Sequence, residues 1–216
     1  MASTQTNGSG QVDYDAIVVG ARCAGSPTAM RLAQQGYRVL VVDRDEFSSD
    51  CISTHFIHPR GVGRLEGWGL LGRVLDTNAP AILNQGGLQD SIFQQAPFGK
   101  KEDGRDIVAL CPRRIVLDEI LVDAAVEAGA TFQGNTSVQE LRRADDGAIA
   151  GIVGRHDGQP FEASARLVIG ADGLHSRIAR LVDAEEYEPS IRCSSRTTAA
   201  STARASRSTQ APTAAP

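Results

Sequence analysis

The sequence is poor in cysteine, and its four cysteines are not arranged as a cross-linking or metal-binding set. Cys23, Cys51, Cys111 and Cys193 lie far apart, and no two of them form a Cys-x-x-Cys pair. A chain of 216 residues is also too large to need disulfides as its main source of stability. This pattern disfavours a disulfide framework and a zinc knuckle, and it predicts reduced thiols in the cytoplasm.

Long apolar runs and an excess of positive charge are also missing. No apolar segment approaches the length of a membrane span, and the first residues, MASTQTNGSGQVDYD, lack the basic region and apolar core of a signal peptide. The formal net charge is −4 and the basic residues are scattered, which argues against nucleic acid as a partner. We therefore expect a soluble, cytoplasmic protein whose 41% hydrophobic residues build one main core.

Both ends of the chain are expected to be disordered, at residues 1–12 and 190–216. The C-terminal stretch is nearly all Ser, Thr, Ala, Arg and Pro, so it cannot bury enough apolar surface to offset its chain entropy. It is either a natural flexible extension or the translation of a shifted reading frame, and its abrupt start after Glu188 favours the frameshift. Residues 13–189 are expected to form the folded domain, which would be a fragment if the frame has shifted.

The clearest local pattern is a strand, a small-residue turn and a helix near the N-terminus. Residues 14–19 are a short apolar run typical of a buried parallel strand, and residues 26–36 have helical spacing. Residues 37–44 form a second apolar run that contains Asp43 near its end. The turn VVGARCAG, residues 18–25, has the outline of a dinucleotide-binding turn, and the whole is a βαβ unit of about 30 residues.

Arg22 stands where a dinucleotide-binding turn normally has its middle glycine. Gly20 supplies the tight turn and Gly25 the close packing of helix on strand, while the N–H groups at the start of the helix attract a phosphate. Either the diphosphate lies slightly further out, with the Arg22 guanidinium folded over it, or the site binds nothing. An ordinary βα turn, with Asp43 as a solvated acid, is a third interpretation.

The middle of the chain predicts shorter elements and one long helix. Residues 61–75 have a helical pattern broken by Gly67 and Gly69, and residues 88–95 and 106–111 alternate like strands of a small sheet. Residues 112–130 form the clearest helix. Its expected buried face consists of Ile115, Ile120, Leu121, Ala124 and Ala128.

The last third of the chain predicts a meander followed by a second strand-turn-helix unit. Short strands are expected near 130–133, 136–141 and 148–155, and the last of them enters a hairpin at Asp157-Gly158. Residues 166–182 then read as a buried strand, a glycine turn and a helix. The predicted fold class is α/β: a doubly wound, Rossmann-like parallel sheet with a small antiparallel sheet inserted.

Three segments in this order resemble a superfamily of flavoproteins. VVGARCAG with VVDR, then RIVLDEIL, then LVIGADGLHSR are similar to the FAD-dependent aromatic hydroxylases and geranylgeranyl reductases. The resemblance runs from about Tyr14 to about Tyr187, and GADGLHSR behind a buried strand is its most specific part. It implies FAD as cofactor, NAD(P)H as electron donor, a small organic substrate, and a monooxygenase-like or reductase-like reaction.

The resemblance also implies a set of cofactor-binding residues. It puts four residues around the FAD diphosphate, namely Gly20, Arg22, Ala24 and Gly25. Asp43 would hold the adenosine ribose, with Arg44 and the backbone of Val138 beside the adenine. Arg114 matches an arginine that reaches the flavin side of the cofactor. The second nucleotide element, linked in the family to both FAD and NAD(P)H, corresponds to Gly170, Asp172 and Gly173.

Simpler roles stay open for several of these residues. Arg114 could belong to a surface ion pair, Val138 to the core, and Asp172 with Gly173 to a turn that caps a helix. His55 and His58 have the i, i+3 spacing of a metal pair but no further ligand nearby, so no metal site is predicted. Their loop is instead expected to line the flavin and substrate pocket. No side chain stands out as a general acid or base, so no catalytic residue is named.

Two alternatives to the flavoenzyme remain. One is a non-catalytic or decaying nucleotide-binding fragment, and the other is a reductase that uses only a nicotinamide cofactor. The second lacks a Tyr-x-x-x-Lys pair, because the two lysines of the chain are Lys100 and Lys101. Full members of the family continue for roughly another domain, so we expect the 216-residue chain to bind FAD weakly and to turn over poorly.

Overall fold

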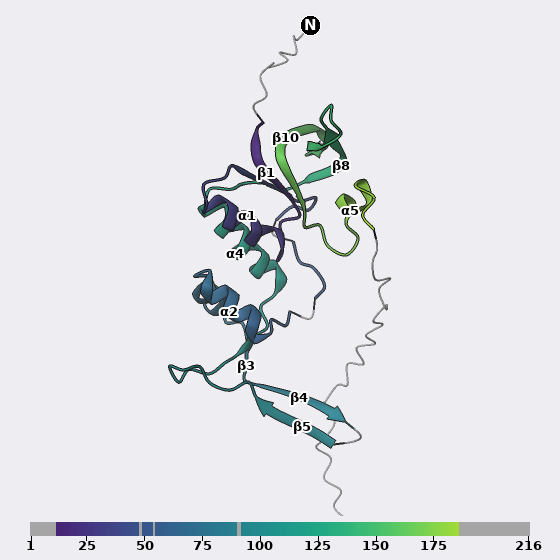
Figure 1. The fold of residues 1–216 in the computed structure, drawn as a ribbon. Coiled ribbons are helices and arrows are strands. Elements are labelled where there is room, and N and C mark those ends of the chain that lie inside the picture. Colours follow the sequence, from purple (N-terminus) through teal and green to yellow (C-terminus); the bar gives the residue numbers. More distant parts are fainter. Residues whose placement is uncertain (1–11, 48, 54, 90–91, 186–216) are drawn as a thin grey trace, which may run out of the picture. The chain divides into compact units, whose positions relative to one another are not determined.

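The computed structural model describes residues 12–47, 49–53, 55–89 and 92–185. The segments expected to be disordered, 1–12 and 190–216, lie outside these ranges except for Val12. A six-stranded sheet organises the described part, and Figure 1 shows its central strands running side by side. In spatial order the strands are β7 (Thr131–Gln133), β2 (Val39–Val42), β1 (Tyr14–Val19), β10 (Gln159–Gly170), β9 (Ile149–His156) and β8 (Thr136–Arg143).

The sheet is parallel on one side and antiparallel on the other. Strands β7, β2, β1 and β10 are mutually parallel, whereas β9 and β8 run antiparallel to their neighbours. The register pairs Val19 with both Val42 and Gly170, and Val42 with Gln133. The four parallel strands therefore end in one row, so the turns that follow them gather at one edge of the sheet.

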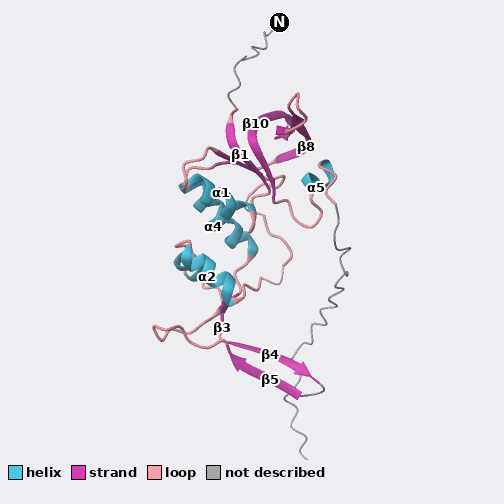
Figure 2. Cartoon of the chain, in the orientation of Figure 1, coloured by secondary structure: helices cyan, strands magenta, loops and turns pink. Residues whose placement is uncertain are grey.

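The helices within the described ranges are drawn as cyan ribbons in Figure 2. They are α1 (Gly25–Ala33), α2 (Pro59–Gly67), α3 (Leu71–Leu75), α4 (Arg114–Glu127) and α5 (Arg177–Leu181). None of the helices in the described ranges combines the length and apolar character that crossing a bilayer requires. Helices α1 and α4 contact each other and lie together beside the sheet (Figure 1).

Successive side chains of β1 and β2 point to opposite faces of the sheet, and each face is buried in its own hydrophobic core. Val18, Val39 and Val41 point to the face that α1 and α4 cover. Ile17, Val19 and Leu40 point to the other face, where the apolar residues come from the meander β8–β10 and from α5. Both faces are buried, as the continuous apolar runs predicted, and the α/β fold class with its inserted antiparallel strands is confirmed.

Several details differ from the sequence expectations. The predicted hairpin strand and the predicted last parallel strand are one 12-residue strand, β10, whose first half pairs with β9 and whose second half pairs with β1. In place of the single small sheet that the sequence predicted for this region, the structure has two separate two-stranded sheets. One joins β3 (Ala81–Ile82) to β6 (Ala109–Leu110), and the other joins β4 (Asn84–Gln89) to β5 (Ile92–Pro97).

Helix α4 buries more of its circumference than the single apolar face that the sequence predicted. Leu117, Val122 and Ala125 are buried in addition to three of the expected residues, whereas Ile115 and Ala128 are only half-buried. The helix also buries Asp118, which is 1% exposed. Burying an ionised carboxylate is costly unless it is paired and hydrogen-bonded, so this residue needs cationic partners.

Candidate functional site

The turn that follows β1 and the turn that follows β10 contact each other at the carboxyl edge of the sheet. We call them the first and the second turn. Gly20 follows β1 with a φ of 102°, and Ala171 follows β10 and donates its N–H to the Val19 carbonyl at 2.7 Å. A Cβ on residue 20 would lie 2.4 Å from the Ala171 carbonyl oxygen. Only glycine fits this contact, so the two strand-to-helix turns can share one wall of a cleft.

Helix α1 starts directly against the first turn. A Cβ on Gly25 would lie 1.7 Å from the Gly20 carbonyl oxygen, so a side chain here would push the helix away from β1. Ser26 fixes the same junction by donating its hydroxyl to the Ala21 carbonyl at 2.7 Å. Because the first intrahelical bond runs from Ser26 to Arg22, the N–H groups of Cys23 and Ala24 have no carbonyl partner within the helix. Such groups attract anions.

Asp43 holds the turn from the end of β2. Its Oδ2 accepts the Ala21 N–H at 2.7 Å, and its Oδ1 accepts the Asp45 N–H at 3.0 Å. The residue is 6% exposed. A carboxylate has about four acceptor positions. Asp43 therefore orders the backbone of the first turn and retains acceptor capacity for a further donor.

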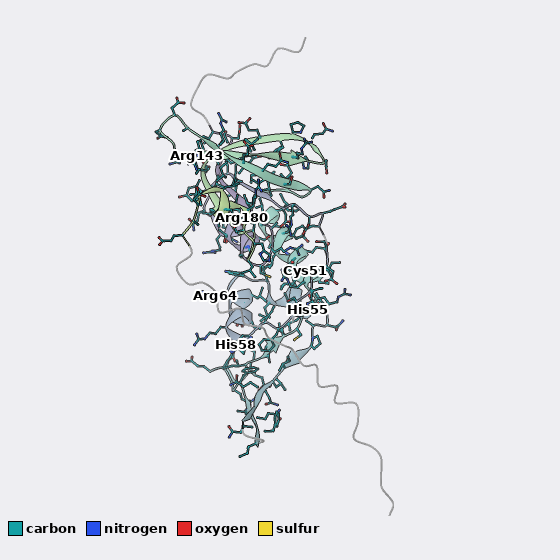
Figure 3. The ribbon with its side chains drawn as sticks, turned by 90° about the vertical axis from the view of Figure 1, so that its right-hand side faces the viewer. Cys51, His55, His58, Arg64, Arg143 and Arg180 are labelled. Atoms are coloured by element: carbon teal, nitrogen blue, oxygen red, sulfur yellow. The ribbon has the colours of Figure 1, made fainter. Side chains whose placement is uncertain are left out.

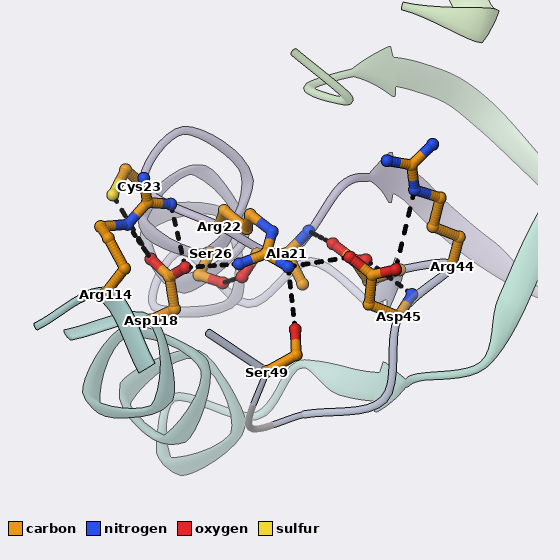
Figure 4. A network of polar contacts seen from close by, with 10 residues as sticks. Ala21, Arg22, Cys23, Ser26, Arg44, Asp45, Ser49, Arg114 and Asp118 are labelled. Atoms are coloured by element: carbon orange, nitrogen blue, oxygen red, sulfur yellow. Dashed lines mark hydrogen bonds and ion pairs between the residues drawn. The ribbon is translucent and has the colours of Figure 1, made fainter. Parts of the chain in front are cut away.

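The Arg22 side chain lies between two carboxylates, as Figure 4 shows. Its Nη1 donates to Asp118 Oδ2 and its Nη2 donates to Asp45 Oδ2, both at 2.8 Å. The same Nη2 also donates to Ser49 Oγ at 2.9 Å, and the guanidinium carbon lies 5.4 Å from the centre of the Phe47 ring. Burial lowers the pKa of Arg22, but hydrogen bonds to Asp45 and Asp118 raise it by more.

Asp118 also binds Arg114 and Cys23. Arg114 makes a two-pronged contact, from Nε to Oδ1 at 3.0 Å and from Nη2 to Oδ2 at 2.9 Å. Part of Cys23 is exposed, but its Sγ lies 3.5 Å from Asp118 Oδ1. Burial of the thiol, together with the Asp118 carboxylate, raises the pKa of Cys23 to about 11. This thiol is therefore protonated at neutral pH and donates to Asp118.

The second turn is organised by Asp172, which caps helix α5. Its Oδ2 accepts the N–H groups of Arg177 at 2.6 Å and Ile178 at 3.2 Å, and its Oδ1 accepts the Ser176 hydroxyl at 2.6 Å. This is the turn-and-cap role that the sequence left open for Asp172. Gly170 lies behind the turn, where an added Cβ would come within 2.9 Å of the Ile178 side chain.

These turns enclose a cleft of about 760 Å³ at the carboxyl edge of the sheet. All the predicted cofactor-binding residues line this cleft except Gly25 and Gly170, which pack behind it. Of those that line it, Arg44 is mostly exposed, and its Nε lies 3.8 Å from Asp45 Oδ1. Val138 is half-buried and packs against the core on the face of the sheet that β8–β10 and α5 cover. The structure therefore brings together residues from five separate segments of the chain.

Sequence reasoning missed some residues of this site. Asp118, Asp45 and Thr136 were not singled out, although Asp118 carries the largest number of polar contacts in the network of Figure 4. One signal was present: Asp118 follows Arg114 by four residues, the spacing of an ion pair along a helix.

His55 and His58 do not line the cleft, so the structure does not place them in the expected pocket. Cys51, a few residues before them, does line it. Figure 3 labels all three residues on the segment between β2 and α2. His58 caps α2 by accepting the Arg60 N–H at 3.4 Å, and His55 has a φ of 57°. Within the described ranges, no group of three or more His, Cys, Asp and Glu side chains is arranged to hold a metal ion.

A parallel sheet with a glycine turn, an acid after the second strand and a cleft at the carboxyl edge defines a nucleotide-binding fold of the Rossmann type. Within that class the chain belongs to the FAD binding domain family, whose sequence profile matches residues 13–210. The fold and the family thus agree with the resemblance that the three sequence segments carried.

The relatives include reductases and monooxygenases. The chain is 30% identical over 176 residues to a digeranylgeranylglycerophospholipid reductase of Methanocella arvoryzae. It is 32% identical over 167 residues to a rifampicin monooxygenase of Rhodococcus hoagii. These alignments cover 78% and 77% of the chain but only 41% and 33% of the relatives. The chain therefore spans well under half the length of the relatives that it matches.

Solved structures share the fold. The flavin-dependent halogenase CmlS superposes with a TM-score of 0.69 at 22% identity, covering 79% of this chain and 31% of the halogenase. Aklavinone-11 hydroxylase, solved with FAD and aklavinone, superposes with a TM-score of 0.64 at 23% identity, covering 80% of this chain and 35% of the hydroxylase.

Proposed function

We propose that this chain forms the FAD-binding part of a flavoprotein oxidoreductase that takes electrons from NAD(P)H and acts on a small organic molecule. The observation that carries the proposal is the convergence at one cleft of two glycine turns and the exposed N–H groups at the start of α1. A cleft of about 760 Å³ lies within the usual size range of small-molecule sites.

The residues present fit a dinucleotide. A diphosphate needs unpaired N–H donors, which the start of α1 offers at Cys23 and Ala24. Gly20 has no Cβ, and this lets the second turn approach the first as closely as the Ala171 carbonyl does. Asp43 has spare acceptor positions for a ribose hydroxyl pair. Arg44, Arg177 and Arg180 add positive charge at the same cleft, and the charge suits a cofactor that carries two phosphates.

Each predicted residue has a proposed task in this arrangement. Gly20, Ala24 and Gly25 shape the diphosphate site, with Arg22 in its wall. Asp43 binds the adenosine ribose, and Arg44 and the backbone of Val138 border the adenine. Arg114 faces the flavin side, and the second turn is formed by Gly170, Asp172 and Gly173.

FAD would supply the redox chemistry, because its flavin ring can accept a hydride and pass electrons onward. The side chains of this chain bind, orient and shield the cofactor. Reduction of a double bond and hydroxylation are both compatible with this role, and the relatives include a reductase and a monooxygenase. No described side chain is assigned as a general acid or base.

The test is an absorbance spectrum of the purified chain after incubation with FAD and desalting. We expect flavin bands to remain with the protein, and we expect NADPH or NADH to bleach them when oxygen is absent. A chain that retains no flavin at any concentration of added FAD would contradict the proposal. Retention of NAD(H) instead would favour the nicotinamide-only reductase.

A matched pair of glycine variants makes this test specific to the cleft. Gly25→Ala adds a methyl group that meets the Gly20 carbonyl, whereas Gly63→Ala adds one on α2 that meets nothing within 4 Å beyond the adjoining residues and the helix's own backbone. The first variant should lose flavin and the second should keep it. Circular dichroism of both variants separates loss of binding from loss of the fold.

A further inference from the structure

Arg22 and Asp118 meet at the wall of the cleft although 96 positions separate them in the chain. Figure 4 shows the Arg22 guanidinium spanning the space from Asp118 on α4 to Asp45 and Ser49 after β2. Two of its nitrogens are already engaged with carboxylates at 2.8 Å. The side chain therefore connects three segments of the chain.

We propose that Arg22 and Asp118 are positioning residues of the FAD cleft: the guanidinium is an ionic bridge that fixes the first glycine turn, and it does not clamp the diphosphate. This inference rests on the proposed function, because the cleft that the bridge shapes is the proposed FAD site. It also resolves the question of how an arginine can replace the middle glycine, since its side chain turns toward α4 and the segment after β2.

Charge compensation supports the bridge. Arg22 and Arg114 contribute two positive charges, and Asp45 and Asp118 contribute two negative charges within hydrogen-bond distance. Little net attraction for a diphosphate is left in this cluster. In contrast, Arg177 and Arg180 donate to backbone carbonyls, so their charges remain available to an anion.

Because Asp118 is buried, loss of its ion pair with Arg22 would leave a buried charge that is only partly compensated. An acid that is 1% exposed depends on its cationic partners, and here both of them come from residues that line the cleft. The two-pronged contact with Arg114 fixes the direction of that side chain as well. Asp118 therefore acts on the cofactor only through Arg22, Arg114 and the turn that they support.

The bridge and the clamp make opposite predictions for Asp118→Asn. If Arg22 were a clamp, loss of the carboxylate would free two guanidinium groups and tighten FAD binding. If Asp118 positions them, its loss leaves the turn unsupported and weakens FAD binding by roughly tenfold or more. Arg22→Met should weaken binding to a similar extent, and the double variant should be no weaker than the more affected single variant.

The experiment measures FAD affinity by fluorescence quenching and the melting temperature of the FAD-free chain. Arg22→Met and Asp118→Asn should both lower that melting temperature by roughly 6 °C or more. Arg44→Met is the charge control, because Arg44 lines the same cleft but bridges no segments; it should weaken FAD by about fivefold at most and leave the melting temperature unchanged. Tighter FAD binding by Asp118→Asn, or additive losses in the double variant, would overturn the proposal.

Two further measurements keep the test decisive. Should Asp118→Asn fail to fold, Arg22→Lys takes its place: a lysine keeps the charge but has one nitrogen where Arg22 uses two to reach separate carboxylates, so binding should fall as in Arg22→Met. Near-normal binding would overturn the bridge. Alkylation of Cys23 reports on the network without FAD. Its pH midpoint should fall from about 11 in Asp118→Asn, and an unchanged midpoint would overturn the bridge even if the wild-type chain bound no flavin.

Discussion

Adding one methyl group at Gly25 tests whether the junction between β1 and α1 is as tight as the structure indicates. In Gly25→Ala the new Cβ would lie 1.7 Å from the Gly20 carbonyl oxygen and 3.1 Å from Val18 Cγ1. Real Cβ contacts essentially never fall below 3.0 Å, so the helix must move by about 1.3 Å, the difference between 3.0 and 1.7 Å. The obstacle is backbone, which cannot rotate away as a side chain would.

The cost of this displacement can be estimated. Overpacking a tight site typically costs about 1–3 kcal/mol, and the backbone contact favours the upper end. At about 2–4 °C per kcal/mol for a chain of this size, the melting temperature should fall by roughly 6–12 °C. Because α1 carries the N–H groups proposed to meet the diphosphate, flavin retention should fall as well.

The assay compares Gly25→Ala with Gly63→Ala by thermal denaturation and by flavin retention after desalting. Gly63 lies inside α2, and a methyl group there would meet nothing within 4 Å beyond the adjoining residues and the helix's own backbone, so the alanine should stabilise the chain by about 0.5–1 kcal/mol. Equal melting temperatures and equal flavin retention for Gly25→Ala and wild type would refute the reasoning about the junction.

Three further predictions concern single groups. Asp43→Asn replaces one of the two carboxylate oxygens with an NH₂, so one of the two backbone N–H groups loses its acceptor and the free energy of unfolding should fall by about 1–3 kcal/mol, measured by denaturant titration; no change would contradict the role of Asp43. Bound FAD should shield Cys23 from iodoacetamide at pH 10, as peptide mapping would detect, and equal labelling with and without FAD would place the cofactor elsewhere. Hydrogen bonds from Ser164 lower the pKa of Asp13 below 3.8; this stabilisation is present above pH 3.8 and is lost as the pH falls through the lower folded value, so Ser164→Ala should flatten the fall in melting temperature between pH 5 and 2.

The βαβ unit could be predicted because its signals are local. The apolar runs of β1 and β2, the helical spacing between them and Asp43 after β2 are all readable in one short window, and the structure has each element within a few residues of its predicted bounds. The hairpin at Asp157-Gly158 was readable for the same reason, since both residues take the positive φ that its turn requires.

The continuity of β10 could not be predicted in this way. Its first half pairs with β9 and its second half with β1, and the partner changes near Ser164 and Ala165. A polar residue at that point looks like a break in the local pattern. From Ala165 onward, β10 stays extended because it pairs with β1, a strand that lies about 150 residues earlier in the chain.

The candidate site was predictable in its residue types but not in its contacts. The spacing of Arg114 and Asp118 suits an ion pair along a helix, yet the sequence gave no sign that Arg22 would bind the same carboxylate, because burial of an acid depends on which charges the fold brings beside it. Likewise, Asp172 was assigned to the second nucleotide element, and the structure adds that its carboxylate caps α5.

The central claim is that the amino end of α1 and the two turns beside it hold the FAD diphosphate, and amide chemical shifts of the ¹⁵N-labelled chain report on it directly. On titration with FAD, the amide signals of Cys23 and Ala24 should move most, together with that of Ala21 in the same turn, while those of α2 should stay in place. Saturable shifts confined to other parts of the chain, with Cys23 and Ala24 unmoved, would contradict the account.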